Sequence, residues 1–315
     1  MKNVRFKPTP SNTLQNTLKQ NMREIRNEDK VYVPADKTHN FYKITKPAYK
    51  NLVHKNVTKE YKRCSANYVN TINENDKIIA ESLELDDRIY AFFKRDAFVN
   101  IKDHKRNYIN NTQCRLLNPA KSDTGKISKV ILSRIIDSIR NIKKYNQWKN
   151  SFAVIDWFKD LKDKKNLSFI EFDIVEFYPS ISEGVLRSAL NWASTITEVS
   201  EDEIEIILQT KTSLLFFDGE CWVKKGNKPF DVSMGSWDGA EVADLIGLYL
   251  LSQLQDIDCD LGLYRDDGLG ATSLSPRLAE KEKQKICKIF QRNGFRIKAN
   301  VNAKNVNFLD INLDL

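Results

Sequence analysis

The chain has 315 residues and a formal charge of +8 at pH 7, because 50 Lys and Arg outnumber 42 Asp and Glu. This length suits about two domains, each with a hydrophobic core. A hydrophobic share of 41%, with only 11 Gly and 8 Pro, excludes a disordered low-complexity chain and indicates a folded globular protein. The positive charge suits a polyanionic partner without proving one.

Five scattered cysteines, without close Cys or His neighbours, exclude a disulfide framework and a zinc site. No stretch approaches the roughly 20 apolar residues that span a bilayer, and the N-terminal sequence lacks the apolar core of a signal peptide. We therefore expect an intracellular protein with no membrane partner. No lysine-rich block is dense enough to choose between nucleus and cytoplasm.

The first half of the chain is basic and predicts a mixture of strands and helices. Residues 1–30 are polar and basic and predict a peripheral arm or short helix. From residue 31 to about 117, short strand-like runs alternate with helical stretches that carry many Lys and Arg residues. Residues 125–148 predict a helix with isoleucines on one face. Its basic side is either solvated or turned toward a nucleic acid.

The second half alternates predicted strands and helices. A strand over 168–175 precedes two helices, over 183–196 and 201–213. The remaining predicted elements are, in order, a hairpin turning at Asp218-Gly219, a helix over about 239–254, a hairpin over 261–274, a helix from Ser275-Pro276 to near 294, and two final strand-like runs.

Carboxylates occur at two places where a predicted strand meets a turn. Asp173 lies near the end of SFIEFDIV, and Asp266 and Asp267 lie at the hairpin tip in GLYRDDGLG. Each alone has an ordinary explanation, a solvated turn or a cap. However, a palm-type polymerase needs carboxylates from two neighbouring strands to hold two Mg²⁺ ions about 4 Å apart.

Three segments in the second half resemble the palm motifs of reverse transcriptases. FDIVEFYPSI resembles the first motif, and YRDD matches the Tyr-x-Asp-Asp signature of the third. Between them, VSMGSWDGAEVADLIGLYLL takes the place of the second motif, a Gly-containing turn that opens a helix, and Met234, Gly235 and Ser236 fit it. The sequence then departs from the commoner Pro-x-Ser-Pro continuation and has Trp-Asp-Gly-Ala at 237–240. The alternative is a simple start of a helix.

Four outer segments resemble those of Penelope-like retroelement polymerases in their order and spacing. These are PADK at 34–37, IKDHK at 101–105, CRLLNPAKSDTGKISK at 114–129 and NFLD at 307–310. The resemblance covers the chain from about residue 31 to its C-terminus. The family's endonuclease module is not visible, and we expect the thumb to be largely absent.

The resemblance implies an α/β (α+β) fold of the right-hand polymerase type. We expect an N-terminal arm over 1–30, fingers over 31–165 and a palm over 166–315, with an antiparallel palm sheet backed by helices. It also implies the site. The expected catalytic and metal-binding residues are Asp173, Asp266 and Asp267, joined at the metals by Ile174, with two Mg²⁺ ions as cofactors and Mn²⁺ as a possible substitute.

The resemblance further implies a nucleotide site. Lys105 and Arg115, with Lys102 nearby, would bind the incoming triphosphate, a role that suits the planar fork of Arg. The other expected contacts are Gly235 in the second motif, Tyr178 as the aromatic that excludes a ribose 2′-hydroxyl, and Lys298 near the pyrophosphate leaving group. The alternatives are solvated surface lysines and a tyrosine packed in the core.

The sequence therefore predicts an RNA-directed DNA polymerase, a retroelement-type nucleotidyltransferase. Its partners would be an RNA or DNA template with a primer and deoxynucleoside triphosphates, with no obligate protein partner. One rival is a domesticated nucleic-acid-binding protein that keeps the fold without catalysis, against which the three intact aspartates argue. The other is an RNA-synthesising polymerase, which Tyr178 disfavours because a small residue there would admit ribonucleotides better.

Overall fold

The computed structural model divides into two compact units. It describes residues 13–82, 95–105, 108, 111–119, 123–212, 214–226 and 230–315. The first unit comprises residues 1–60 and 97–117, and the second comprises 61–96 and 118–315. No helix within the described ranges is long and apolar enough to cross a membrane. The division into arm, fingers and palm stays a prediction.

Among its described residues, the first unit contains two antiparallel strand pairs and two helices. Its elements are α1 (Thr13–Asn27), β1 (Lys30–Pro34), β2 (Phe41–Thr45), α2 (Lys46–Glu60), β4 (Phe98–Ile101) and β5 (Cys114–Leu117). The strands β1 and β2 form one pair and β4 and β5 the other, and a parallel bridge between Ala35 and Ile101 joins the pairs. The core takes Val53 and Val57, one helical turn apart on α2, together with Val33 and Val99. These elements mix strands and helices, as predicted for residues 31 to about 117, although residues 61–96 belong to the second unit.

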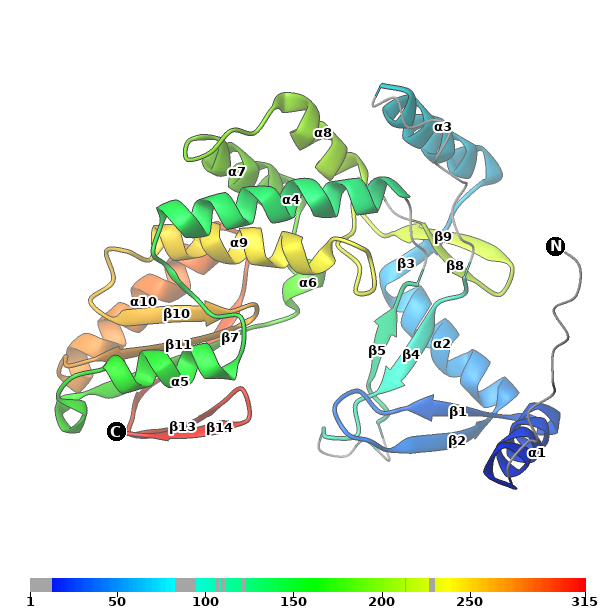
Figure 1. The fold of residues 1–315 in the computed structure, drawn as a ribbon, viewed down its shortest axis with the longest axis horizontal. Helices are drawn as coiled ribbons and strands as arrows, with labels where there is room; N and C mark the ends of the chain where they lie inside the picture. The colour runs from blue at the N-terminus through cyan, green and yellow to red at the C-terminus, as the bar shows by residue number, and fades with distance from the viewer. Residues whose placement is uncertain are drawn as a thin grey trace, which may run out of the picture. The chain divides into compact units, whose positions relative to one another are not determined.

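The second unit contains most of the helices (Figure 1). Its helices are α3 (Ala66–Ser82), α4 (Asp123–Ile142), α5 (Ser151–Asp160), η1 (Lys164–Asn166), α6 (Phe177–Ser180), α7 (Glu183–Ser194), α8 (Glu201–Gln209), α9 (Gly239–Gln253) and α10 (Pro276–Arg292). Its strands are β3 (Tyr61–Arg63), β6 (Asn146–Gln147), β7 (Ser168–Ile174), β8 (Leu215–Phe217), β9 (Glu220–Lys224), β10 (Asp260–Tyr264), β11 (Asp267–Thr272), β12 (Ile297–Ala303), β13 (Asn305–Phe308) and β14 (Ile311–Asp314).

A five-stranded sheet in the order β12-β7-β11-β10-β6 forms the centre of the second unit. All its pairings are antiparallel except that of β10 with the short edge strand β6. A second sheet has the order β3-β9-β8, and β13 pairs with β14. The predicted mixed α/β class with an antiparallel sheet and packed helices is therefore confirmed.

Alternation along β7 divides the sheet into two faces, each with its own core. Ile170 and Phe172 face a core shared with α4, α7, α8, α9 and α10, where the ring of Phe172 meets Phe290 edge-on at 5.2 Å. Phe169 faces the opposite core, which α5 and the β13–β14 pair provide. Figure 1 shows these two layers on either side of the sheet. Successive side chains of a strand point to opposite faces. Both sets are apolar here because both faces of the sheet are covered.

Several predicted boundaries differ from the observed ones for physical reasons. The helix expected over 125–148 ends at Ile142, because Asn146 and Gln147 join the sheet as β6. The last predicted strand is a hairpin, whose turn residues Leu309 and Asp310 have φ angles of 48° and 63°. Leu-Asp carries no turn signal comparable to Asp218-Gly219, which turns the β8–β9 hairpin as predicted.

Gly268 generates a prediction about stability. A Cβ on this buried residue would overlap the ring of Phe172, its register partner on β7, and that ring is only 2% exposed. Gly268→Ala should therefore lower the free energy of unfolding by about 2 kcal/mol, the usual cost of overpacking a core. Denaturant unfolding checks this. Gly184→Ala in α7, where a Cβ would meet nothing closer than 3.9 Å, serves as the control and should not destabilise. Equal stability of Gly268→Ala and the wild type would contradict the packing described here.

Candidate active site

Three predicted site residues form one row across neighbouring strands of the central sheet. Asp173 on β7 is paired directly with Asp267 on β11 and, on its other side, with Lys298 on β12. Directly opposed residues of antiparallel strands project from the same face, with Cβ atoms about 5 Å apart. The strand register thus brings two carboxylates and one ammonium group together from segments that are far apart in the chain.

The row of Asp173, Asp267 and Lys298 lies at the end of β7, where an exposed side chain follows a buried one. Asp173 is exposed and follows the buried Phe172, so strand alternation places it on the face of Phe169 and Asp267 on the face of Leu269. Two like charges directly opposite one another destabilise a strand pair unless an opposite charge compensates them. Lys298 supplies one such charge. The arrangement is therefore suited to attracting a further cation.

Asp266 lies in the two-residue turn that joins β10 to β11. Its main-chain oxygen accepts a hydrogen bond of 2.8 Å from the nitrogen of Ile174, which ties the end of β7 to this turn. Arg265, the first residue of the turn, has a φ of 52°. A side chain held in the left-handed region costs on the order of 1 kcal/mol, and such strain is common at functional sites.

The donor groups of the row fit a magnesium ion. Mg²⁺ prefers hard oxygen ligands and is commonly held by one or two carboxylates together with substrate phosphates. Asp173 and Asp267 can provide the carboxylates. Across the described part of the chain, no group of three or more His, Cys, Asp or Glu side chains is arranged to hold a metal. Asp266 as a third ligand therefore stays a prediction. So does Ile174, whose apolar side chain leaves only its main chain for the role.

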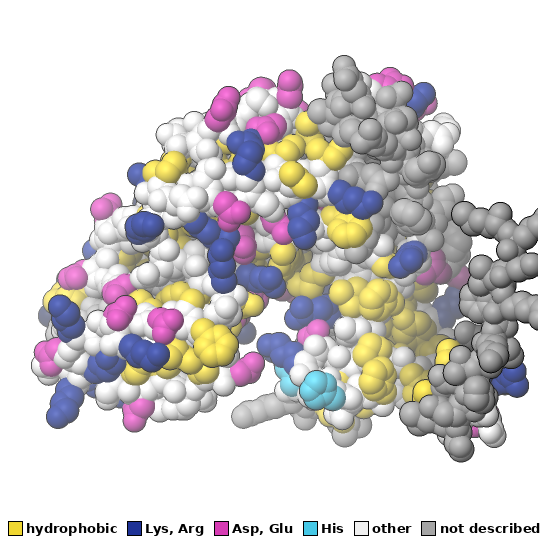
Figure 2. All heavy atoms as spheres, viewed as in Figure 1, with side chains coloured by type: hydrophobic (Ala, Val, Ile, Leu, Met, Phe, Trp, Pro, Cys, Tyr) yellow, Lys and Arg dark blue, Asp and Glu magenta, His cyan; other side chains and the backbone are white. Residues whose placement is uncertain are grey.

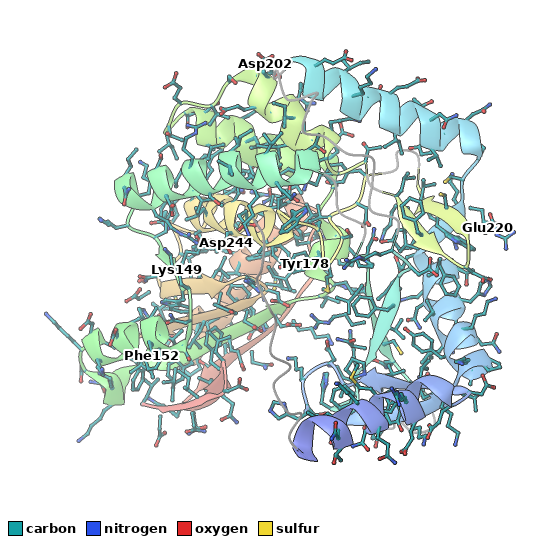
Figure 3. All side chains as sticks on the ribbon, turned by 45° about the vertical axis from the view of Figure 1, so that its right-hand side comes forward. Lys149, Phe152, Tyr178, Asp202, Glu220 and Asp244 are labelled. Atoms are coloured by element: carbon teal, nitrogen blue, oxygen red, sulfur yellow. The ribbon has the colours of Figure 1, made fainter. Side chains whose placement is uncertain are left out.

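Tyr178 projects from α6, which begins three residues after β7 ends. Glu176, at the start of this short helix, has a φ of 53°, so the chain turns sharply between the carboxylate strand and the tyrosine. The ring is half-buried, and its Cε1 lies 3.8 Å from the position of a Cβ on Gly239, the first residue of α9 (Figure 3). Tyr178 thus borders the segment that carries the second predicted motif.

Gly235 occupies a turn that only glycine fits. Its φ is 107°, and a Cβ there would lie 2.6 Å from the main-chain oxygen of Asn118. Asn118 is 3% exposed, donates its main-chain nitrogen to the oxygen of Met234 at 3.1 Å, and donates its side-chain amide to the oxygen of Leu214 at 3.0 Å. The backbone of the turn is therefore held against a buried asparagine.

The first unit brings three of the outer motifs together. The nitrogen of Asp36, in PADK, donates to the oxygen of Ile101 at 2.8 Å, and Nε of Arg115 lies 2.8 Å from Oδ1 of Asp36. The Asp36 side chain is 5% exposed and that of Arg115 is 35% exposed. The two side chains are therefore in ionic contact without a hydrogen bond between them. Neither Nε of Arg115 nor Oδ2 of Asp36 has a hydrogen-bond partner among the described residues.

Two side chains of the IKDHK segment in the same unit have shifted pKa values. Hydrogen bonds from Thr38 and Asn40 lower the pKa of Asp103, which keeps its carboxylate ionised. Burial lowers the pKa of His104, and the charges of Lys105 and Lys37 lower it further. The groups that cause both shifts belong to the same unit, which also contains Lys105 and Arg115.

Sequence reasoning missed several residues that hold these segments. Asp36 and Asn118 lie within motifs recognised from the sequence, yet neither was assigned a role. Asp238 and Lys211 are each 1% exposed, and sequence reasoning treated Asp238 only as a departure from the expected motif. That departure was the available signal, because a charged residue within a segment that is otherwise packed needs a partner of opposite charge once it is buried.

Comparison with known proteins establishes the fold. No protein-family model matches the sequence, and no curated protein matches it. Among solved structures, the chain resembles Candida tropicalis telomerase in its apo form, with a TM-score of 0.65, 10% identity, and coverage of 96% of this chain and 56% of the telomerase. The same telomerase truncated from its C-terminal domain matches with a TM-score of 0.62 and 12% identity, and the match covers 90% of this chain and 61% of the telomerase. Candida albicans telomerase in complex with a fragment of telomeric RNA matches with a TM-score of 0.57 and 11% identity, and the match covers 90% of this chain and 51% of the telomerase.

The chain shares its fold with these telomerase chains. It spans between about half and three-fifths of the telomerase chains that it matches. At such low identity the likeness concerns the fold alone. Activity, substrates and partners therefore depend on this chain's own residues.

Proposed function

We propose that this protein is an RNA-directed DNA polymerase that extends a primer with deoxynucleoside triphosphates. The observation that carries the proposal is the strand register that places Asp173 opposite Asp267 and Lys298 opposite Asp173. A fold of the reverse-transcriptase kind supports it. The outer motifs favour the Penelope-like subgroup within that class.

The proposed roles follow from charge and position. Asp173, Asp266 and Asp267, with the main chain of Ile174, would hold two Mg²⁺ ions or Mn²⁺ in their place, and these would supply charge neutralisation and activation of the attacking hydroxyl. Strand-borne carboxylates suit this role because rigid elements hold their geometry.

The remaining site residues act on the nucleotide itself. Lys298, opposite Asp173, stabilises the negative charge that develops on the departing pyrophosphate. Tyr178 on α6, whose ring lies beside the start of α9, excludes a ribose 2′-hydroxyl by its bulk, and the turn at Gly235 contributes main-chain contacts. In the first unit, Arg115 and Lys105 bind the triphosphate, and Asp36 fixes the direction of the Arg115 guanidinium.

A primer on an RNA or DNA template is the proposed macromolecular partner. On α4, Lys129, Arg134 and Arg140 form ion pairs with Glu241, Glu203 and Asp244, respectively, so these basic groups serve the packing of the helix. Lys143 and Lys144 at its end are exposed. Figure 2 shows Lys and Arg side chains interspersed with Asp and Glu over the visible face of this unit. Template binding therefore draws on scattered cationic groups.

Removal of one carboxylate tests catalysis separately from binding. Asp173→Asn keeps the size of the side chain but removes a charge from the metal site, at a cost of several kcal/mol in the transition state. Single-turnover primer extension on an RNA template should slow by roughly a thousandfold or more. Affinity for primer–template without nucleotide should be unchanged or slightly higher, because a group that repels phosphate is neutralised.

Asp156→Asn provides the matched control for this experiment. Asp156 is an exposed residue of α5, 74% accessible and paired with Lys159, so its replacement should leave both measurements unchanged. Extension by Asp173→Asn at the wild-type rate would overturn the catalytic assignment. Absence of extension by the wild-type protein, with primer–template still bound, would instead favour the rival in which the protein binds nucleic acid without copying it.

Tyr178→Ala tests the discrimination between sugars. Loss of the ring opens space beside α9, so the efficiency of ribonucleotide incorporation relative to deoxynucleotide should rise at least about tenfold, or about 1.4 kcal/mol in discrimination. Tyr178→Phe keeps the ring and should behave like the wild type. Tyr249→Ala, which removes another half-buried tyrosine that packs on Trp192, is the control. An active Tyr178→Ala enzyme with an unchanged ratio would show that Tyr178 is a packing residue.

A further inference from the structure

A carboxylate and an ammonium group are buried together at the start of α9. The side chains of Asp238 and Lys211 are each 1% exposed and form an ion pair through Oδ2 of Asp238. Ser128, which is 0% exposed on α4, donates its hydroxyl to the same oxygen, and Thr210 donates to it at 3.4 Å. One carboxylate oxygen thus joins the end of α8, the start of α4 and the first turn of α9.

The pair lies next to the segment that touches Tyr178. Asp238 is the residue immediately before α9, and its main-chain oxygen accepts the helical hydrogen bond from Val242 at 2.9 Å. Gly239 follows it, and a Cβ there would lie 2.8 Å from Oγ of Ser236 and 3.8 Å from Cε1 of Tyr178. The position of Asp238 therefore sets how closely α9 approaches the Tyr178 ring.

The other end of the same segment is anchored as well. The nitrogen of Asp231 donates to the main-chain oxygen of Lys211 at 2.8 Å, and Oδ2 of Asp231 accepts from the hydroxyl of Tyr61 at 2.6 Å. Lys211 thus holds the segment over 231–238 twice, by its main chain at the first residue and by its side chain at the last. Asn118 holds the middle through Met234.

A buried ion pair is a costly way to obtain stability alone. Desolvation of both charges offsets most of their attraction, and apolar residues of similar volume are often as stable. Buried polar groups are better attested as devices that select one arrangement among several. The pair occurs where the sequence departs from the common second motif, and it fixes the backbone at the start of α9.

We infer that Asp238, Lys211 and Ser128 form a positioning network that sets the contact between α9 and Tyr178 and thereby determines discrimination against ribonucleotides. The inference rests on the proposed polymerase function. The three residues act through Tyr178, so they are positioning residues that do not touch the substrate.

Three variants weaken the network to different degrees. Ser128→Ala removes one hydrogen bond and keeps the ion pair. Asp238→Asn leaves the ammonium group of Lys211 buried without its counterion, and the double variant Asp238→Asn with Lys211→Met removes both charges. Asp244→Asn is the matched control, because Asp244 lies farther along α9 (Figure 3) and pairs with Arg140 at 3.0 Å.

The measurement is the ratio of ribonucleotide to deoxynucleotide incorporation efficiency in primer extension, with thermal unfolding recorded for every variant. The double variant should raise the ratio about tenfold, and Ser128→Ala should raise it less. Asp244→Asn should lower the unfolding temperature without changing the ratio. In a Tyr178→Ala background the network variants should add nothing, because they act through the missing ring.

The outcomes separate this inference from the function on which it rests. If Asp238→Asn alone fails to fold, Ser128→Ala and the double variant decide. A ratio equal to that of the wild type in those folded variants would overturn the inference and leave the polymerase assignment intact. Additive effects in the Tyr178→Ala background would also overturn it. Absence of extension by the wild type on every template would overturn the proposed function and this inference together.

Discussion

The antiparallel register between β7 and β11 is the constraint on which the account depends. It places Asp173 opposite Asp267, and a slip of one residue would send Asp173 to the core of Phe172 and Ile170. The buried ring of Phe172 beneath Gly268 resists such a slip, because only a residue without a side chain fits there. Packing on the face of Phe172 thus fixes the positions of the charges on the opposite face, which Asp173 shares with Phe169. The like-charge pair is stable only within a well-packed sheet.

A second layer of order lies around the start of α9. Glycine at 235 allows the turn to approach Asn118, while Asp238, Lys211 and Ser128 hold the helix that follows. Two kinds of constraint therefore position the two parts of the proposed site, the carboxylates and the tyrosine. Strand pairing places the charged groups, and a buried polar network places the segment beside Tyr178. Solvent-exposed charges would do this less well, because exposed ion pairs contribute little.

Much of this architecture could be predicted from the sequence, and the failures have physical causes. Alternation and turn residues predicted the strands around Asp173 and the Asp218-Gly219 hairpin, and the acidic residues pointed to the site. The Leu309-Asp310 turn was missed because its left-handed backbone is imposed by tertiary packing rather than by local preference. The Lys211–Asp238 pair was missed because a single sequence does not reveal which charged residues are buried together. The register itself required the structure, since partners so far apart in the chain leave no local signal.

The central claim is that the carboxylate row binds divalent cations for templated synthesis. The most direct test counts Mn²⁺ ions by electron paramagnetic resonance in the complex with primer–template and a nucleotide that cannot react. We expect two bound ions per wild-type chain and fewer in Asp267→Asn, with the Asp156→Asn control equal to the wild type. The same number of ions bound with the same affinity by Asp267→Asn and by the wild type would contradict the account.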